Sequence, residues 1–281
     1  MKYIGYAISD VGKVRKNNED NMYLNGQYRT DLDALSWEFS LQDADTRPGG
    51  QAVKGRTVNS SHPLCTVLAA VYDGVGGAEK GEVASFLSAQ EMNRCIEPPM
   101  GDGLYDYIRI ANAEILRAAQ GQQMGSTYVG LVIRHDLCWF NNVGDSRGYL
   151  FRNGRLKRMT HDHNMVMELV EEGILTKEQA AKHPARHAIY QFLGMKEEDA
   201  LMEPYEHPVF GAKAGDYFLL CSDGLTDMLD EEEIVDILDG DMASEPDLSE
   251  VKEKAARLVE EALKRGGRDN VTVILILALT E

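Results

Sequence analysis

The sequence predicts an α+β fold in which two antiparallel β-sheets are stacked and helices cover their outer faces. Short apolar segments rich in β-branched and aromatic residues recur along the chain, and long amphipathic segments lie between them. Asn153-Gly154 separates two such apolar segments, which is typical of a hairpin and therefore of antiparallel pairing. No linker rich in Pro, Gly or Ser divides the 281 residues, so we expect a single domain over residues 1–281.

The strands are expected where the apolar runs are short and contain β-branched or aromatic residues. They are Tyr3–Ser9, Asn21–Leu24, Cys65–Tyr72, Thr127–Arg134, Leu137–Val143, Arg147–Arg152, Tyr217–Cys221 and Val271–Leu279. The tripeptide Arg134-His135-Asp136 joins two of these segments and predicts a second tight connection.

The helices are expected in the longer segments. They are Glu79–Cys95, Leu104–Gln120, Met165–Glu172, Lys177–Lys182, Glu231–Leu238 and Leu248–Arg265. Asp230 can cap the fifth helix by accepting a hydrogen bond from the backbone N–H of Glu233, and Gly240 follows as a terminator. In the last helix, apolar residues recur at helical spacing, which predicts one buried face.

Residues 28–63 differ from the rest, because they are polar and rich in Gly, Ser and Asn. We expect them to form a loop insertion on the surface that takes no part in the chemistry. A loop that contacts a substrate or partner is the alternative.

The charge and the apolar content exclude some partners. The formal net charge is −17, which disfavours nucleic acids and anionic membrane surfaces. The chain begins without a basic and apolar leader, and no uncharged apolar run reaches the roughly 18–20 residues that a membrane helix needs. We therefore expect a cytoplasmic monomer that binds neither nucleic acid nor membrane.

Four aspartates stand next to apolar strands, with glycine beside or close to each. They are Asp73, Asp145, Asp223 and Asp269. A strand end holds a carboxylate rigidly, and an adjacent glycine leaves room to approach it. Any one of these motifs alone could be a plain turn. Together, hard oxygen ligands without cysteine or clustered histidine favour Mg²⁺ or Mn²⁺ over Zn²⁺.

Seven elements that contain these residues follow one another along the chain. They are Arg15-Lys16-Asn17-Asn18-Glu19-Asp20-Asn21, Asp73-Gly74-Val75-Gly76-Gly77, Gly125-Ser126-Thr127, Gly144-Asp145-Ser146-Arg147, Thr160-His161-Asp162-His163, Ser222-Asp223-Gly224-Leu225-Thr226-Asp227 and Asp269-Asn270-Val271-Thr272. In their order and content they resemble the metal-dependent serine/threonine protein phosphatases of type 2C, the PPM family, and in particular its bacterial members. The resemblance extends over residues 9–279.

The resemblance implies a four-layer α/β/β/α sandwich and a defined activity. That activity is hydrolysis of phosphoserine and phosphothreonine in proteins by a metal-activated water. Mn²⁺ or Mg²⁺ would be the cofactor, with two ions per site and a third left open. The partners would be phosphorylated proteins, as substrates of a cognate serine/threonine kinase.

The resemblance also implies the roles of individual residues. The expected metal-binding residues are Glu19, Asp20, Asp73, Gly74, Asp145, Asp223, Asp227 and Asp269. Asp73 would bridge two ions, Asp223 and Asp269 would complete the ligands of one of them, and Glu19 and Asp20 would act mainly through water. These three aspartates and Arg15 are the expected catalytic residues.

The resemblance implies more specific roles for Arg15, Asp145 and Asp227. Arg15 would bind the substrate phosphate, because a guanidinium can hold two phosphate oxygens at once. Asp145 and Asp227 lie where relatives bind a third, weaker ion, although Asp145 could equally cap the turn before Arg147.

One position departs from the family pattern. Many eukaryotic relatives have a histidine, a proposed general acid, where this chain has Val75, as bacterial relatives often have an apolar residue. The source of the proton for the leaving group therefore stays open. We interpret Ser126, Thr127, His161 and His163 as structural residues.

Residues 164–194 resemble the mobile flap beside the site in bacterial members, although a helical hairpin packed on the core is an alternative. The segment carries Lys177, Lys182, His183, Arg186 and His187 on an otherwise acidic chain. This basic cluster suggests that the flap discriminates between protein substrates.

Two other functions fit parts of the same pattern. A metal-dependent phosphohydrolase of small phosphorylated metabolites would use the same ions. A non-catalytic phosphopeptide-binding module would not need Asp73, Asp223 and Asp269, which argues against that function.

Overall fold

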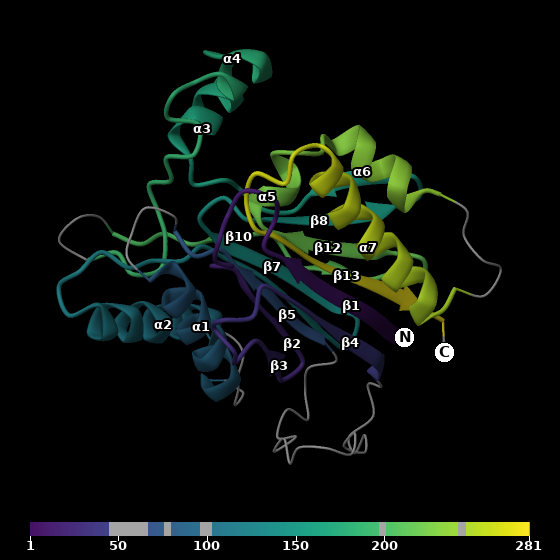
Figure 1. The fold of residues 1–281 in the computed structure, drawn as a ribbon. Helices are drawn as coiled ribbons and strands as arrows, with labels where there is room; N and C mark the ends of the chain where they lie inside the picture. Colours follow the sequence, from purple (N-terminus) through teal and green to yellow (C-terminus); the bar gives the residue numbers. More distant parts are fainter. Residues whose placement is uncertain (45–66, 76–79, 96–102, 197–200, 241–245, 281) are drawn as a thin grey trace.

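Two stacked antiparallel sheets with helices on both outer faces form the molecule, as the sequence predicts (Figure 1). The structure, a computed structural model, describes residues 1–44, 67–75, 80–95, 103–196, 201–240 and 246–280. Among these residues, no helix has the length and apolar character required to cross a lipid bilayer.

The first sheet has six strands and contains both ends of the described chain. Their order is β4 (Ser36–Ala44), β1 (Lys2–Asp10), β13 (Val271–Leu279), β12 (Tyr217–Cys221), β8 (Arg147–Arg152) and β9 (Arg155–Arg158). β1 and β13 pair over their whole lengths, from Lys2 opposite Leu279 to Asp10 opposite Val271. This register places the loop after β1 beside the loop before β13.

The second sheet carries the remaining strands. Their order is β10 (Tyr205–Glu206), β7 (Leu137–Val143), β6 (Tyr128–Arg134), β5 (Val67–Tyr72), β2 (Asn21–Leu24) and β3 (Gln27–Tyr28), and β11 (Phe210–Gly211) also pairs with β7. The predicted tight turns are present, with positive φ at His135 and Asp136 and at Asn153 and Gly154.

The helices cover the two outer faces, apart from the two short ones within residues 164–194 (Figure 1). They are α1 (Gly81–Cys95), α2 (Gly103–Ala119), α3 (Met165–Glu171), α4 (Lys177–Ala181), α5 (Asp223–Thr226), α6 (Glu231–Leu238) and α7 (Leu248–Lys264). Side chains of α1 and α2 pack with β5 and β6, and those of α6 and α7 pack with β1, β12 and β13. The predicted cap of α6 is confirmed, since Asp230 Oδ1 accepts from the Glu233 N–H at 2.9 Å.

The space between the sheets is filled by apolar side chains from both, among them Val71, Phe140, Phe218 and Ile274. Because each sheet also has helices on its other face, β5 and β12 are buried along their whole lengths. Such strands read as continuous apolar runs, which is why the sequence located them. Their carboxyl ends are therefore rigid supports for the residues that follow them.

One expectation is corrected by the structure. Residues 36–44 belong to the segment 28–63, which we expected to be a loop, yet they form β4 and pair with β1 along the edge of the first sheet. Residues 45–63 lie outside the described residues, as do the starts of the strand expected at Cys65 and the helix expected at Glu79.

The segment 164–194 projects from the sandwich. In Figure 1, α3 and α4 lie well away from both sheets, so the hairpin does not pack on the core. Its base is attached through an Asn164–Ile189 bridge and an Arg158–Glu171 ion pair of 2.7 Å. We call residues 164–194 the flap below.

Candidate metal centre

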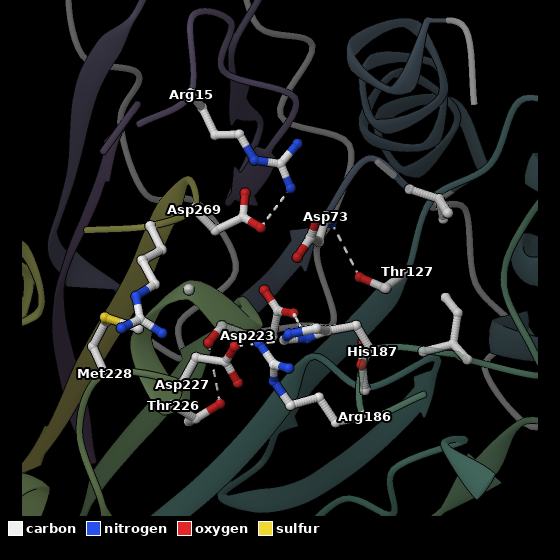
Figure 2. Close-up of a pocket in the computed structure, with 15 residues that line it drawn as sticks. Arg15, Asp73, Thr127, Arg186, His187, Asp223, Thr226, Asp227, Met228 and Asp269 are labelled. Carbon is white, nitrogen blue, oxygen red and sulfur yellow. Dashed lines mark hydrogen bonds and ion pairs between the residues drawn. The ribbon is translucent and has the colours of Figure 1, made fainter. Parts of the chain in front are cut away.

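The predicted aspartates meet in one pocket, although they come from four separate parts of the chain (Figure 2). Asp73 follows β5, Asp145 follows β7, Asp223 begins α5 after β12, and Asp269 precedes β13. These four residues and Asp227 line a pocket of about 810 Å³. Its basic lining residues are Arg15, Arg186, His187 and Arg268.

Asp73 is fixed through its backbone. Its N–H donates to Thr127 Oγ1 at 3.0 Å, and the Thr127 N–H donates to the Asp73 carbonyl at 2.8 Å. Thr127 Oγ1 shares a further hydrogen bond of 2.7 Å with Ser146 Oγ. The hydroxyl of Thr127, which also lines the pocket, is therefore occupied in supporting Asp73, in agreement with the interpretation of Thr127 as a structural residue.

Gly74 allows two loops to approach closely. Its N–H donates to the Glu19 carbonyl at 3.2 Å. A Cβ at this position would lie only 2.5 Å from the Gly81 carbonyl carbon and 2.6 Å from the Glu19 carbonyl oxygen. Only glycine fits here without a shift of backbone atoms. The close approach joins the Glu19 loop to the end of β5.

Asp20 lies behind the pocket lining and is fully buried. Its Oδ2 accepts hydrogen bonds from Ser222 Oγ at 2.8 Å and from Thr272 Oγ1 at 2.6 Å. Its Oδ1 has no partner in the described part of the chain. Burial raises the pKa of Asp20 to about 7, although these two hydroxyl donors oppose the shift.

The other carboxyl groups are shifted in the same direction. Burial, followed by the nearby charges of Asp20 and Asp223, holds the pKa of Asp73 well above its usual value. Burial and the charge of Asp223 do the same for Asp145. Burial and the charge of Asp227 raise the pKa of Asp223 to about 6. Each group resists ionisation because it is removed from water and lies close to other carboxylates.

This arrangement fits hard divalent cations. Several carboxylates converge, one buried oxygen of Asp20 lacks a partner, and the donor atoms of Asp73, Asp223 and Asp269 are oxygens. Bound cations would favour the ionised carboxylates and reverse the pKa shifts. The predicted ligands are thus brought together, with Asp73, Asp145, Asp223, Asp227 and Asp269 in the pocket lining and Glu19, Asp20 and Gly74 next to it.

Arg15 lies at the rim of the pocket, as Figure 2 shows. Its Nη2 donates to Asp269 Oδ2 at 2.7 Å, and its Nη1 lies 3.6 Å from Glu19 Oε2. The guanidinium therefore partly balances two carboxylates of the site. From this position it borders the space that Asp73 and Asp223 also face.

His187 is a residue of the site that the sequence did not single out as a ligand. The flap places its Nδ1 at 3.6 Å from Asp227 Oδ2 and 3.8 Å from Asp223 Oδ2, and these three side chains could hold a metal ion. The pocket therefore offers one imidazole nitrogen beside the expected oxygen ligands. Thirty-six positions separate His187 from Asp223, so no local spacing pointed to this contact.

His163 and Asp162 support the site from the base of the flap. The Gly144 N–H donates to His163 Nδ1 at 3.0 Å, and burial lowers the pKa of His163 to about 4. A neutral, hydrogen-bonded imidazole confirms the structural interpretation of His163. Asp162 accepts a hydrogen bond from Arg147 Nη2 at 2.6 Å. This contact fixes Arg147, which lies two residues after Asp145.

Comparisons with known proteins agree with this geometry. The family model described as protein phosphatase 2C matches residues 56–261. The protein phosphatase PhpP of Streptococcus pneumoniae is 30% identical over 284 residues, which cover 96% of this chain and 95% of PhpP.

The catalytic domain of a longer relative has also been solved. The serine/threonine protein phosphatase PstP of Mycobacterium tuberculosis is 33% identical over 277 residues, which are 96% of this chain but 44% of PstP. The chain thus spans less than half the length of that relative. The catalytic domain of PstP in complex with two manganese ions superposes with a TM-score of 0.73 at 31% identity, covering 100% of both chains. The chain belongs to the protein phosphatase 2C family.

Proposed function

We propose that the chain is a serine/threonine protein phosphatase that depends on Mn²⁺ or Mg²⁺. The convergence of Asp73, Asp223 and Asp269 in one pocket with Arg15 at its rim carries this proposal. The activities named for PstP and PhpP support it. The substrates would be phosphorylated proteins, which a serine/threonine kinase supplies.

Asp73, Asp223 and Asp269 would hold two ions, with the Gly74 carbonyl as a further oxygen ligand. When bound, divalent ions lower the pKa of water and neutralise charge on the phosphoryl oxygens. Glu19 and Asp20 supply additional negative charge from behind this group. The manganese complex of PstP supports a count of two ions.

Arg15 would orient the substrate. Its guanidinium has five N–H donors in a fixed plane, and the pairs with Asp269 and Glu19 use only part of them. The remaining donors can bind phosphate oxygens while the pair with Asp269 persists. Arg15 would thereby hold the phosphate next to the carboxylate cluster without removing a metal ligand.

The function itself is tested by metal dependence and substrate choice. With Mn²⁺, the protein should hydrolyse both p-nitrophenyl phosphate and a phosphothreonine peptide, and excess chelator should abolish both activities. Asp73→Asn should lower kcat by more than about 100-fold, since even partners of metal ligands contribute about 10–100-fold. Turnover of small phosphorylated metabolites but not of the phosphothreonine peptide would favour the metabolite phosphohydrolase. Binding of the peptide without any turnover would favour a binding module.

The raised pKa values predict how stability depends on pH. For Asp20 the folded value is about 7 against an ordinary 3.8, so the folded state binds more protons than the unfolded state between these values. Stability of the chelator-treated protein should therefore fall as the pH rises through this window. Mn²⁺ should raise the melting temperature more at the upper end of the window than at the lower end.

Asp20→Asn is the matched control for this prediction. The amide oxygen can still accept from Ser222 and Thr272, but the group no longer titrates. The variant should show a shallower fall in melting temperature with pH. An unchanged slope would contradict the assignment of the pH dependence to this carboxyl group.

We also propose a third cation between His187, Asp223 and Asp227, with Asp145 lining the same pocket. His187→Ala should bind one Mn²⁺ fewer per chain in equilibrium dialysis, because it lacks the nitrogen ligand. His183→Ala is the control, since His183 Nδ1 accepts from the Ala185 N–H within the flap. Pulsed electron paramagnetic resonance should detect a nitrogen bound to Mn²⁺ in the wild type and in His183→Ala, but not in His187→Ala. The same ion count in both variants and the wild type would exclude this site.

Within the flap, Arg186 is the residue that we expect to act on substrate choice. Arg186 lines the pocket, whereas Lys182 does not. Arg186→Glu should lower kcat/KM for a phosphopeptide by about tenfold, because a rim charge steers a charged partner. It should leave p-nitrophenyl phosphate turnover nearly unchanged, and Lys182→Glu should affect neither substrate. An equal loss on both substrates in Arg186→Glu would show that Arg186 supports the metal centre instead.

A further inference from the structure

Arg29 is a buried arginine that lies directly after β3, outside the pocket. Only 3% of its surface is exposed to solvent. Within the described residues no carboxylate lies within ion-pair distance of it, and all of its hydrogen bonds go to backbone carbonyls. Nη1 donates to Asn18 O at 2.7 Å and to Asp20 O at 3.0 Å, Nε donates to Asp31 O at 2.8 Å, and Nη2 donates to Leu32 O at 2.6 Å.

Burying the Arg29 guanidinium is unfavourable in itself. Removing a guanidinium from water costs free energy, and burial accordingly lowers the pKa of Arg29. Among the described residues no ion pair offsets that cost, and the charges of Asp20 and Asp31 oppose the lowering of the pKa without cancelling it. What the side chain provides instead is a planar set of donors that satisfies carbonyl oxygens in a loop without regular structure.

The carbonyls that Arg29 binds flank Glu19. Asn18 and Asp20 are held on either side of it by the same Nη1 atom. Glu19 itself is fixed through its backbone, since its N–H donates to Asn270 Oδ1 at 2.8 Å and its carbonyl accepts from Ser85 Oγ at 2.6 Å. Arg29 thus completes the bonding of a loop that carries two of the expected metal-binding residues.

Contacts with Asn21 and with the rest of the segment 28–44 hold Arg29 in place. The guanidinium carbon lies 4.5 Å from the centroid of the Trp37 ring, and Trp37 belongs to β4. The backbone of Arg29 is paired with the Asn21 side chain, which accepts from its N–H at 3.1 Å and donates to its carbonyl at 3.2 Å. The Leu35 carbonyl accepts from Asn18 Nδ2 at 3.0 Å. The first half of the segment 28–63 therefore wraps around the Glu19 loop.

We propose that Arg29 is a positioning residue of the metal centre, and that Trp37 keeps it in place. Arg29 sets the backbone at residues 18–20, and through it the positions of the Glu19 and Asp20 carboxylates, which would help to hold the ions. It acts on the ions only through this backbone. The proposal rests on the proposed function only in taking the carboxylate cluster as the site for divalent cations.

Binding of Mn²⁺ tests this role without any substrate. Arg29→Met should weaken Mn²⁺ binding, measured by the signal of free Mn²⁺ in electron paramagnetic resonance, by about 10–100-fold, as for other residues that support metal ligands. Arg29→Lys should lie between this variant and the wild type, because an ammonium can reach fewer carbonyls. At saturating Mn²⁺, KM for p-nitrophenyl phosphate should change little, since Arg15 is untouched.

Arg152→Met is the matched control. Like Arg29, Arg152 donates to a backbone carbonyl, Gly211 O at 2.9 Å, and unlike Arg29 it also pairs with a carboxylate, Asp216 at 2.6 Å. It lies at the end of β8 opposite Arg147 and the pocket. Its loss should lower the melting temperature and leave Mn²⁺ affinity unchanged. Trp37→Leu should weaken Mn²⁺ binding less than Arg29→Met, and it serves with Arg29→Lys if Arg29→Met does not fold.

The outcomes separate the two proposals. Wild-type Mn²⁺ affinity in Arg29→Met, or in both Arg29→Lys and Trp37→Leu, would overturn the positioning role. Equal losses of affinity in Arg152→Met would overturn it too, by showing a general effect of stability. A wild type that binds Mn²⁺ but hydrolyses no phosphate ester would overturn the proposed function and leave this test valid.

Discussion

Repulsion between carboxylates is the constraint on which the rest of the structure depends. Asp73, Asp145, Asp223 and Asp269 lie in one pocket, where burial and then neighbouring negative charge raise the pKa of the first three. Such a cluster persists in a folded protein only if its backbone cannot relax away from it. β5 and β12, buried along both faces, provide that rigidity, because moving their ends would disturb packing between the sheets.

The groups that support the cluster leave its negative charge available. Thr127 supports Asp73 through backbone and hydroxyl contacts, and the hydroxyls of Ser222 and Thr272 bind one oxygen of Asp20. Neutral donors of this kind fix a carboxylate without cancelling its charge. Arg29 follows the same principle with a charged side chain, since its donors go to backbone carbonyls, that of Asp20 among them, rather than to the Asp20 carboxylate. The charge of the carboxylates is therefore left for cations to neutralise.

The sequence located most of the fold because its elements carry strong local patterns. β12 and β13 are continuous apolar runs, and α6 begins with a capping box, so their limits were predicted to within a residue. β4 was missed although Trp37, Phe39 and Leu41 alternate with polar residues. Its alternation lies in a polar, glycine-rich segment, and only pairing with β1 makes it a strand. α5 has four residues, too few for a helical period.

The site shows the same division between local and long-range information. The aspartates were predictable because each lies beside its own strand end, with glycine close by. Arg29 was not, because hydrogen bonds to carbonyl oxygens involve no particular partner residue and leave no pattern in the sequence.

His187 was equally hidden, since its contacts depend on how the flap returns to the pocket. The sandwich thus supplies the carboxylates, whereas two segments outside its regular layers supply the groups around them. The segment 28–44 fixes the Glu19 loop from behind, and the flap brings His187 and Arg186 to the open side. On the roles proposed for Arg29, Arg186 and His187, changes in either segment should alter ion binding or substrate choice while the sandwich stays the same.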